Sequence, residues 1–418
     1  MSTTSAGTNW AGNVTYRART LHHPTTTDEV RRIVTGARRV RALGSRHSFT
    51  PIADSEQLIS LDGLPGEISV DATAGEVTVP AGTTYAELAA ALAPRRLALP
   101  NLASLPHISV AGAVATGTHG SGTRLGSLGT AVRGLELVTG DGELHQVRRG
   151  EPDFDGLVVG LGALGIVTAV TLAVMPSYEV AQRVYTDLPW DVVLGQFDEL
   201  MASGDSVSVF HRAGERTEQL WVKRLQPGEP YPDELYGARA ALVARNPVPG
   251  ADAANATEQL GVAGPWSERL PHFRSGFTPS SGEEIQSELL VGREHAAAAI
   301  EAMLGLGALI TPLLFVAELR TIAADDLWLS PMYGRDTLGL HFTWHRQPDA
   351  VAHAVAALEQ ALAPFAARPH WGKVTEMDAA ALAPLYPRWD DFLALRERLD
   401  PRDVFVNDWL IEHVLGRD

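Results

Sequence analysis

The first feature of this sequence that could do chemistry is a histidine in a loop of small residues, directly after a short apolar strand. Residues 41–49 read Arg-Ala-Leu-Gly-Ser-Arg-His-Ser-Phe, so the histidine is His47. Gly and Ser leave backbone N–H groups uncovered, and such groups form a concave nest suited to a pyrophosphate. His47 beside that nest could act as a metal ligand, as an acid or base, or as a covalent anchor for a cofactor. The alternative is a turn histidine bonded to a neighbouring carbonyl.

A second segment of small residues, 100–122, carries almost no charge and is dense in Gly, Ala, Ser and Thr. Small residues let the backbone approach a flat ligand, and hydroxyl and amide groups supply hydrogen bonds. A flexible surface loop is the alternative, but such linkers rarely carry apolar residues spaced like Ile108, Val110 and Val114. The segment is therefore predicted to be buried and to line a ligand.

Two later segments carry polar pairs at strand spacing. Glu318 and Arg320 lie two residues apart in 313–320, and His341 and Thr343 do so in 338–344. Each pair therefore points to one face, and the apolar residues 338, 340, 342 and 344 point to the other. An antiparallel sheet with one wet face gives the same alternation. The mixture of Glu, Arg, His and Thr favours a cavity wall that grips several hydroxyls.

The elements that must position these residues can be read from periodicity and turn signals. Residues 26–37 predict a helix with a capping box formed by Thr26 and Glu29, and the strand 40–43 follows it. Two strands are expected around residues 74–75, within 68–80. A capped helix is expected from Thr84 to about Pro94, and a hairpin over 135–147 with a two-residue Asp141-Gly142 turn. Beyond about residue 178 we expect strands at 207–211 and 219–224, loops at 226–232 and 246–250, and helices after 373.

Residues 160–165 match the pattern G-x-G-x-x-G, but the context opposes a nicotinamide dinucleotide site. The residues that follow, 166–175, are rich in β-branched types and predict a strand. The dinucleotide motif must instead open a helix whose N-terminus faces the pyrophosphate. A tight turn between two elements is the preferred interpretation.

Composition limits the classes of function. The 418 residues include 34 basic and 50 acidic side chains, a net charge of −16, which disfavours nucleic acid and anionic membranes as partners. There is no cysteine, so thiolate catalysis and iron–sulfur clusters are excluded. The first residues lack a signal-peptide pattern and no apolar run approaches 18 residues, so a cytoplasmic location is expected. The glycosylation patterns at Asn13 and Asn255 are interpreted as chance matches.

Together these segments resemble flavoproteins of the vanillyl-alcohol oxidase type and, within them, the alditol oxidase group. The resemblance extends from the N-terminus to Asn407 and rests on segments 9–13, 41–49, 104–119, 318–320, 341–343 and 369–373. It implies an α+β, two-domain fold of the PCMH type. Residues 1–176, completed by 375–418, would bind FAD. Residues 177–374 would form a substrate domain built on an antiparallel sheet with flanking helices.

The same resemblance implies FAD covalently attached through His47, and no metal. The other residues that it assigns to the cofactor are Arg41, Ala42, Leu43, Gly44, Ser45, Arg46, Ser48, Ser104, Ser109, Gly112, Thr116, Gly117, Thr118, His119, Gly165, Ile166, His370 and Asn407. His119 and His370 are expected to be contacts of the cofactor, not anchors.

The implied reaction is oxidation of the terminal C1 hydroxyl of alditols such as xylitol and sorbitol to the aldose. A hydride passes to flavin N5, and O₂ is reduced to H₂O₂. The substrate would be held by Ser104, Glu318, Arg320, Thr343 and Lys373. Alcohol oxidation needs a base within hydrogen-bond reach. His341 has a suitable pKa, Lys373 would serve if desolvated, and Arg320 would stabilise the developing alkoxide. The small polyol and O₂ are the expected partners of a monomer.

Two alternatives remain. An aldonolactone oxidoreductase shares the same FAD domain, and some of these enzymes use an acceptor other than O₂. In them a small residue matching Ala103 gates oxygen, which glycine admits and alanine hinders, so oxidase and dehydrogenase activity both stay open. A flavin-free sugar-binding protein is the other alternative, and the intact polar set argues against it.

Overall fold

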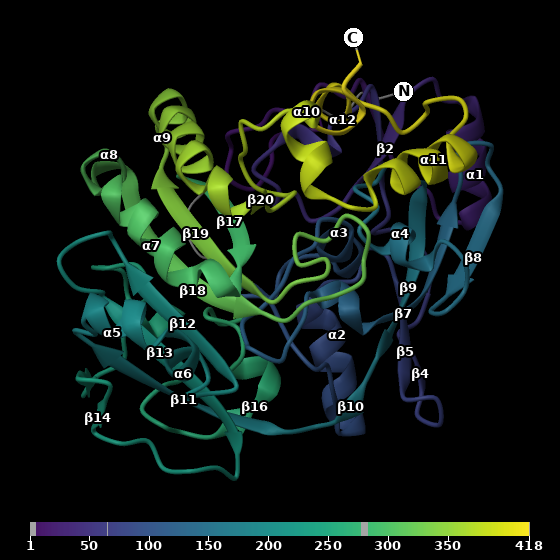
Figure 1. The fold of residues 1–418 in the computed structure, drawn as a ribbon. Coiled ribbons are helices and arrows are strands. Elements are labelled where there is room, and N and C mark those ends of the chain that lie inside the picture. Colours follow the sequence, from purple (N-terminus) through teal and green to yellow (C-terminus); the bar gives the residue numbers. More distant parts are fainter. Residues whose placement is uncertain (1–5, 65, 277–282, 418) are drawn as a thin grey trace.

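The first half of the chain opens with a small parallel sheet, and its edge strand Val40–Leu43 leads into the His47 loop. The computed structural model describes residues 6–64, 66–276 and 283–417 (Figure 1). The sheet has the order β1-β3-β2 (Thr20–His22, Gln57–Ser60, Val40–Leu43). Helix α1 (Thr27–Gly36) begins where the sequence predicted, because the Thr26 side chain accepts the Glu29 N–H. The expected capping box is incomplete, since the Glu29 carboxylate accepts hydrogen bonds from Thr25 instead.

A five-stranded antiparallel sheet completes this half. Its order is β4-β5-β9-β7-β8 (Ser69–Asp71, Glu76–Pro80, Ile166–Ala173, Val132–Val138, Leu144–Arg148). Helix α2 (Tyr85–Leu92) has the complete predicted capping box at Thr84. The β7–β8 turn is longer than the predicted two residues, because the Thr139 N–H donates to the Glu143 carbonyl at 3.0 Å. The glycines of 160–165 connect α4 (Phe154–Val158) to strand β9, so they form a turn before a strand, as predicted.

The second half is built on a ten-stranded sheet. Its main path is β14-β15-β11-β13-β12-β18-β19-β17-β20, with β16 (Gly264–Pro265) paired to β11. The strand bounds are Glu234–Leu235, Ala238–Ala240, Glu179–Thr186, Gln219–Gln226, Ser206–His211, Leu314–Ile322, Thr337–His345, Glu284–Gly292 and Arg368–Pro369. The adjacent strands β12, β18, β19 and β17 are all antiparallel. An α+β fold with an antiparallel substrate-side sheet is therefore confirmed.

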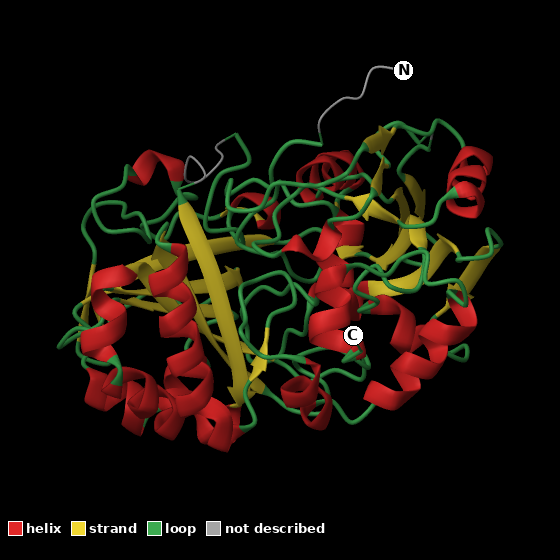
Figure 2. Ribbon diagram, turned by 90° about the horizontal axis from the view of Figure 1, so that it is seen from above, coloured by secondary structure: helices red, strands yellow, loops and turns green. Residues whose placement is uncertain are grey.

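Helices cover one face of this sheet (Figure 2). The helices are α5 (Trp190–Gly195), α6 (Phe197–Met201), α7 (Ala296–Gly305) and α9 (Pro348–Leu362). Leu338, Leu340, Phe342 and Trp344 of β19 are buried in the core that these helices form with the sheet. The alternation seen in the sequence is therefore a real difference between two faces.

The C-terminal segment returns to the first half. In Figure 1 helices α10, α11 and α12 (Ala379–Leu382, Trp389–Leu399, Asp408–Leu410) lie beside the N-terminal elements. The Val40 N–H donates to the Val404 carbonyl at 2.9 Å. Leu382, Trp389 and Phe392 belong to the core of the first half, which also takes Trp371 from the middle region. The exact domain limits stay a prediction.

Within the described residues, no single helix is long and apolar enough to cross a membrane. One bent pair, Arg293–Gly305 with Gly307–Leu313, meets the length and composition required, with a 57° angle between its parts. Its residues Ala296, Ile300 and Met303 are buried in the core of the second half.

Candidate active site

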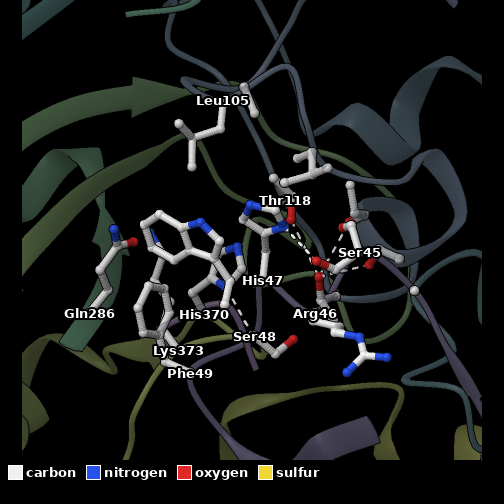
Figure 3. Close-up of a pocket in the computed structure, with 18 of the residues that line it drawn as sticks. Ser45, Arg46, His47, Ser48, Phe49, Leu105, Thr118, Gln286, His370 and Lys373 are labelled. Carbon is white, nitrogen blue, oxygen red and sulfur yellow. Dashed lines mark hydrogen bonds between the residues drawn. The ribbon is translucent and has the colours of Figure 1, made fainter. Parts of the chain in front are cut away.

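A cavity of about 420 Å³ lies between the small-residue loops of the first half and the helix-free face of the large sheet. Figure 3 shows the loop of Ser45 to Ser48 on one side of this cavity and Gln286 of β17 on the other. Both small-residue segments and both polar pairs singled out from the sequence reach the same cavity. Its volume falls in the range typical of ligand sites.

The loop after β2 and the helical turn Val110–Ala115 pack closely around Ser109, each with a glycine at the contact. A Cβ added to Gly44 or to Gly112 would lie 2.8 Å from the Ser109 hydroxyl oxygen. Ser109 in turn donates its N–H to the Ser45 hydroxyl at 3.0 Å, which joins the two small-residue segments. Because these glycines carry no side chain, a large flat ligand with phosphate groups could approach the backbone closely here.

His47 lines the cavity and also makes the carbonyl contact that the sequence left as its alternative. Its Nδ1 lies 2.9 Å from the Ser45 carbonyl oxygen, and the Trp10 ring stacks on the imidazole at 5.4 Å between centroids. Burial lowers the pKa of His47 to about 4. The imidazole is therefore neutral near pH 7, which is the form that can act as a nucleophile.

Most of the residues assigned to the cofactor lie in the cavity wall. They are Arg41, Ala42, Leu43, Gly44, Ser45, Arg46, His47, Ser48, Ser104, Ser109, Gly112, Thr116, Thr118, His119, Gly165 and His370.

Gly117, Ile166 and Asn407 do not line the cavity wall. Ile166 points into the core beneath it, while the next residue, Val167, lines the cavity, as strand alternation requires. The Asn407 amide instead donates to the carbonyls of Pro51, Ile52 and Asp54. Gly117 has positive φ and faces Pro331. The structure thus gives these three residues supporting positions, and direct contact with a cofactor stays a prediction for them.

The turn glycine Gly162 is explained by Arg41. The Arg41 guanidinium donates to the carbonyls of Leu161 and Phe405, and burial lowers its pKa to about 10. A Cβ on Gly162 would lie 2.8 Å from Arg41 Nη2, and its φ is +66°. Gly162, the second glycine of the G-x-G-x-x-G match, therefore makes room for an arginine that ties the turn to the C-terminal segment.

On the opposite wall, the predicted polar pairs are brought together by strand register. Glu318 of β18 pairs with His341 of β19, so their side chains project from adjacent positions. The Thr343 hydroxyl lies 3.3 Å from His341 Nε2, and Arg320 donates to the Ser104 hydroxyl at 3.2 Å. All four strand residues, together with Ser104 and Lys373, line the cavity.

One residue at the centre of this wall was missed by the sequence analysis. Glu288 of β17 pairs with His341 from the other side and has a fully buried side chain. Its carboxylate accepts hydrogen bonds from Lys373 at 2.6 Å and from Arg320 at 3.1 Å. Burial alone would raise its pKa, but Lys373, His119 and Arg320 hold that pKa well below its ordinary value. Alternation of polar residues at 284, 286 and 288 was the signal that could have found it.

Gly339 lies beside this buried ion pair and leaves room for it. It pairs with Arg320 on one side and Leu290 on the other. A Cβ at this position would lie 3.1 Å from Glu288 Oε1. The missing side chain lets the carboxylate lie close to this strand.

At the centre of the sheet wall two carboxylates, Glu288 and Glu318, lie beside two basic side chains, Arg320 and Lys373. Burial raises the pKa of Glu318, and burial lowers the pKa of Lys373. Burial and the neighbouring Lys373 lower the pKa of His341 well below its ordinary value. Lys373 Nζ lies 2.8 Å from His341 Nδ1. A neutral imidazole next to an amine group is suited to proton transfer.

Among the described residues around this wall, three buried polar atoms have charged or titratable neighbours but no hydrogen-bond partner: Glu318 Oε1 and Arg320 Nε of the wall itself, and His119 Nε2 of the facing small-residue segment. Leaving such a group unsatisfied costs about 1–3 kcal/mol, so these atoms mark where a polar ligand would bind. Together with the glycine-lined loop, they fit a site for a large cofactor and a small polar substrate. They fit FAD on the loop side and a hydroxylated molecule on the sheet side.

His119, Glu288 and His370 also come within 4.8 Å of one another, a grouping whose side-chain types can bind metals. Charge argues against a metal here. Both oxygens of Glu288 already face cations, Arg320 and Lys373, so a divalent ion would enter a positive neighbourhood.

The loops of the second half contribute a further wall that periodicity could not predict. It includes Asn246, Val248 and His272. His272 Nε2 lies 3.7 Å from Glu318 Oε1, and its segment is fixed because Lys223 donates to the carbonyls of residues 269–271. The fully buried Lys223 is therefore a structural support for the cavity.

Comparisons with known proteins agree with this geometry. Residues 18–148 match the family model of the FAD binding domain, and residues 291–413 match that of D-arabinono-1,4-lactone oxidase. The chain is 49% identical to alditol oxidase of a Streptomyces species over 97% of this chain and 98% of that protein. It is 30% identical to L-gulono-1,4-lactone dehydrogenase of Mycobacterium tuberculosis over 98% of each. The solved structure of cholesterol oxidase from B. sterolicum superposes with a TM-score of 0.79 at 18% identity, covering 98% and 96% of the two chains.

The alditol oxidase relative and the matched FAD-binding domain define a flavin-dependent oxidoreductase of the vanillyl-alcohol oxidase type, and the superposition agrees with that fold. The sequence identity to alditol oxidase, over nearly the full length of both chains, then defines the family within this class. The chain belongs to the alditol oxidase family.

Proposed function

We propose that this protein oxidises the terminal C1 hydroxyl of alditols such as xylitol and sorbitol to the aldose, with FAD covalently bound at His47. The bound flavin would accept the hydride at N5, and O₂ would accept the electrons to give H₂O₂. The observation that carries the proposal is one cavity with His47 on one wall and Glu318, Arg320, His341, Thr343 on the other. The 49% sequence identity to an alditol oxidase supports alditols as the substrate class.

The residues of the sheet wall would divide the work between binding and proton transfer. The Glu318 carboxylate would accept hydrogen bonds from the polyol hydroxyls, and the hydroxyl groups of Thr343 and Ser104 would accept or donate them. Arg320 stays charged and stabilises the alkoxide that develops at C1. The His341–Lys373 pair removes the hydroxyl proton. The access of water to this wall is limited, because the side chains of Glu318 and Arg320 are only 5% and 6% exposed.

The test is a visible spectrum of the purified protein under anaerobic conditions, before and after addition of xylitol. Bleaching of the flavin bands supports alditol oxidation, and recovery of colour in air supports O₂ as acceptor. His341→Ala and Lys373→Ala should keep their flavin but lose bleaching. His353→Ala, on the exposed side of α9, is the matched control. Full bleaching by either cavity variant would remove that residue from the mechanism, and unbleached wild type would reject alditols.

Oxidation of a sugar lactone is the second candidate. The match of residues 291–413 to a lactone oxidase model favours it, and so does the relative that is a lactone dehydrogenase. Ala103 lines the cavity, where by resemblance alanine would hinder O₂. Bleaching by L-gulono-1,4-lactone but not by xylitol would select this reaction.

A further inference from the structure

Lys373 sits between a carboxylate and an imidazole, and that position couples its protonation to the imidazole of His341. Its Nζ lies 2.6 Å from Glu288 Oε2 and 2.8 Å from His341 Nδ1. On the far side of the ring, His341 Nε2 faces the Thr343 hydroxyl at 3.3 Å and the cavity. Only the Nε2 side of this ring can therefore meet a substrate.

The charge on Lys373 decides which nitrogen of His341 carries the proton. An ammonium has no lone pair and must donate to Nδ1, so the neutral ring then holds its proton at Nε2 and presents a donor to the cavity. An amine can accept from Nδ1–H, and Nε2 then presents a lone pair. His341 is a base toward the cavity only when Lys373 is neutral.

We propose that His341 and Lys373 form a two-step proton relay and that Glu288 is the positioning residue that sets its working pH. The inference rests on the proposed alcohol oxidation. The hydroxyl proton moves to Nε2 while the Nδ1 proton moves to Lys373 Nζ. The O–H electron pair becomes the second C–O bond, and the C1–H pair leaves as the hydride that the flavin accepts. The imidazole never holds a full positive charge, and the new ammonium pairs with Glu288.

The surroundings of Lys373 explain why Glu288 controls the relay. Its charged and titratable neighbours are Glu288 of β17, Glu318 and Arg320 of β18, His341 of β19, and His370 of its own loop; His119 and His272 face Glu288 and Glu318. Burial and Arg320 lower the pKa of Lys373, and Glu288 opposes them. The side chain of Lys373 is 13% exposed, so the proton can pass from it to water after each turnover.

Removing the charge of Glu288 should therefore move the relay to lower pH. An opposite charge within about 4–6 Å shifts a pKa by about 1–3 units, so Glu288→Gln should lower the working pH by about that amount. The first measurement needs no substrate. Nitrogen-15 signals of the histidine rings, assigned with His341→Gln, report which nitrogen of His341 is protonated as the pH changes. The second is the anaerobic rate of flavin reduction by xylitol against pH.

In the wild type, the proton of His341 should switch from Nε2 to Nδ1 at the pH where reduction becomes fast. Both midpoints should fall together in Glu288→Gln. Glu359→Gln is the matched control, because this half-buried carboxyl bonds Thr375 close to the same loop but lies outside the groups that shift Lys373. Its two midpoints should equal those of the wild type.

Midpoints that stay unchanged in Glu288→Gln, with a rate lowered equally at every pH, would overturn the proposal and leave Glu288 a structural role. If that variant does not fold, the wild type alone tests the relay. A nitrogen-15 midpoint that differs from the midpoint of the reduction rate by more than about one pH unit rejects it. Xylitol that fails to bleach the flavin rejects the proposed function instead. The nitrogen-15 titration still tests the coupling of His341, Lys373 and Glu288 in that case.

Discussion

Arg320 gives the sharpest test of how charge is arranged in the cavity. Its guanidinium lies 3.1 Å from Glu288, 3.6 Å from Glu318 and 3.2 Å from the Ser104 hydroxyl. Replacement by Met keeps a long side chain and removes the charge. Two buried carboxylates then face Lys373 as the remaining close cation.

The size of the effect follows from burial. Removing one partner of a buried ion pair costs about 3–5 kcal/mol in the free energy of unfolding. With an unfolding entropy of about 2.1 cal/mol/K per residue, the 418 residues would then melt about 3–6 °C lower in a single transition. Loss of a group that stabilises an oxyanion should lower the rate of flavin reduction by about 10²- to 10³-fold.

Thermal unfolding and anaerobic stopped-flow reduction by xylitol measure the two effects in Arg320→Met. Arg320→Lys is the control, because it keeps the charge but cannot reach three partners as the guanidinium fork does. It should melt closer to the wild type and reduce its flavin at an intermediate rate. A methionine variant that melts like the wild type, or reduces its flavin within about tenfold of it, would refute the charge arrangement.

Three further predictions concern the anchor, the oxygen path and pH. His47→Ala should release its flavin into the supernatant on acid precipitation, whereas a coloured pellet would reject the covalent bond. Ala103→Gly should speed reoxidation of the reduced protein by O₂ and leave reduction by xylitol unchanged; an unchanged oxygen rate would show that this methyl group does not gate O₂. Burial raises the pKa of Glu359 to about 7. The folded state therefore binds the extra proton between about pH 4.5 and 7, and stability falls as pH rises through that window, by at most about 3 kcal/mol. Urea unfolding at both ends of the window measures the free energy of unfolding. In Glu359→Gln this contribution to its pH dependence should be lost. The same change with pH in the two proteins would contradict the raised pKa of Glu359.

Local patterns predicted the strands of the cavity wall well, because one face of each strand is covered by helices. Leu340 and Phe342 are in the core, and His341 and Thr343 face the cavity, as alternation required. Glu288 was overlooked although its strand alternates, because a carboxylate at the centre of a buried sheet is recognisable only once its partners are known. Those partners, Lys373 and Arg320, are 85 and 32 residues away.

Other details depended on tertiary contacts that no short pattern contains. His272 reaches the cavity because a lysine buried in another strand holds its loop, and the loop itself has no periodicity. The family resemblance placed Ile166 and Asn407 near the cofactor. In the structure, strand alternation turns the Ile166 side chain into the core, and the Asn407 amide donates hydrogen bonds to backbone carbonyls. Contact of these two residues with a cofactor therefore stays a prediction.

The C-terminal return also has a consequence for how the protein is made. Asn407 holds the carbonyls of Pro51, Ile52 and Asp54, just past the His47 loop, across 353 to 356 residues. A ribosome adds about 5–20 residues per second, so the loop waits roughly 20 to 70 s after its own synthesis for this clamp. During that interval the loop lacks the support that Asn407 gives to the residues just past it. Capture of the cofactor by a finished loop is therefore a late event, after translation has passed Asn407.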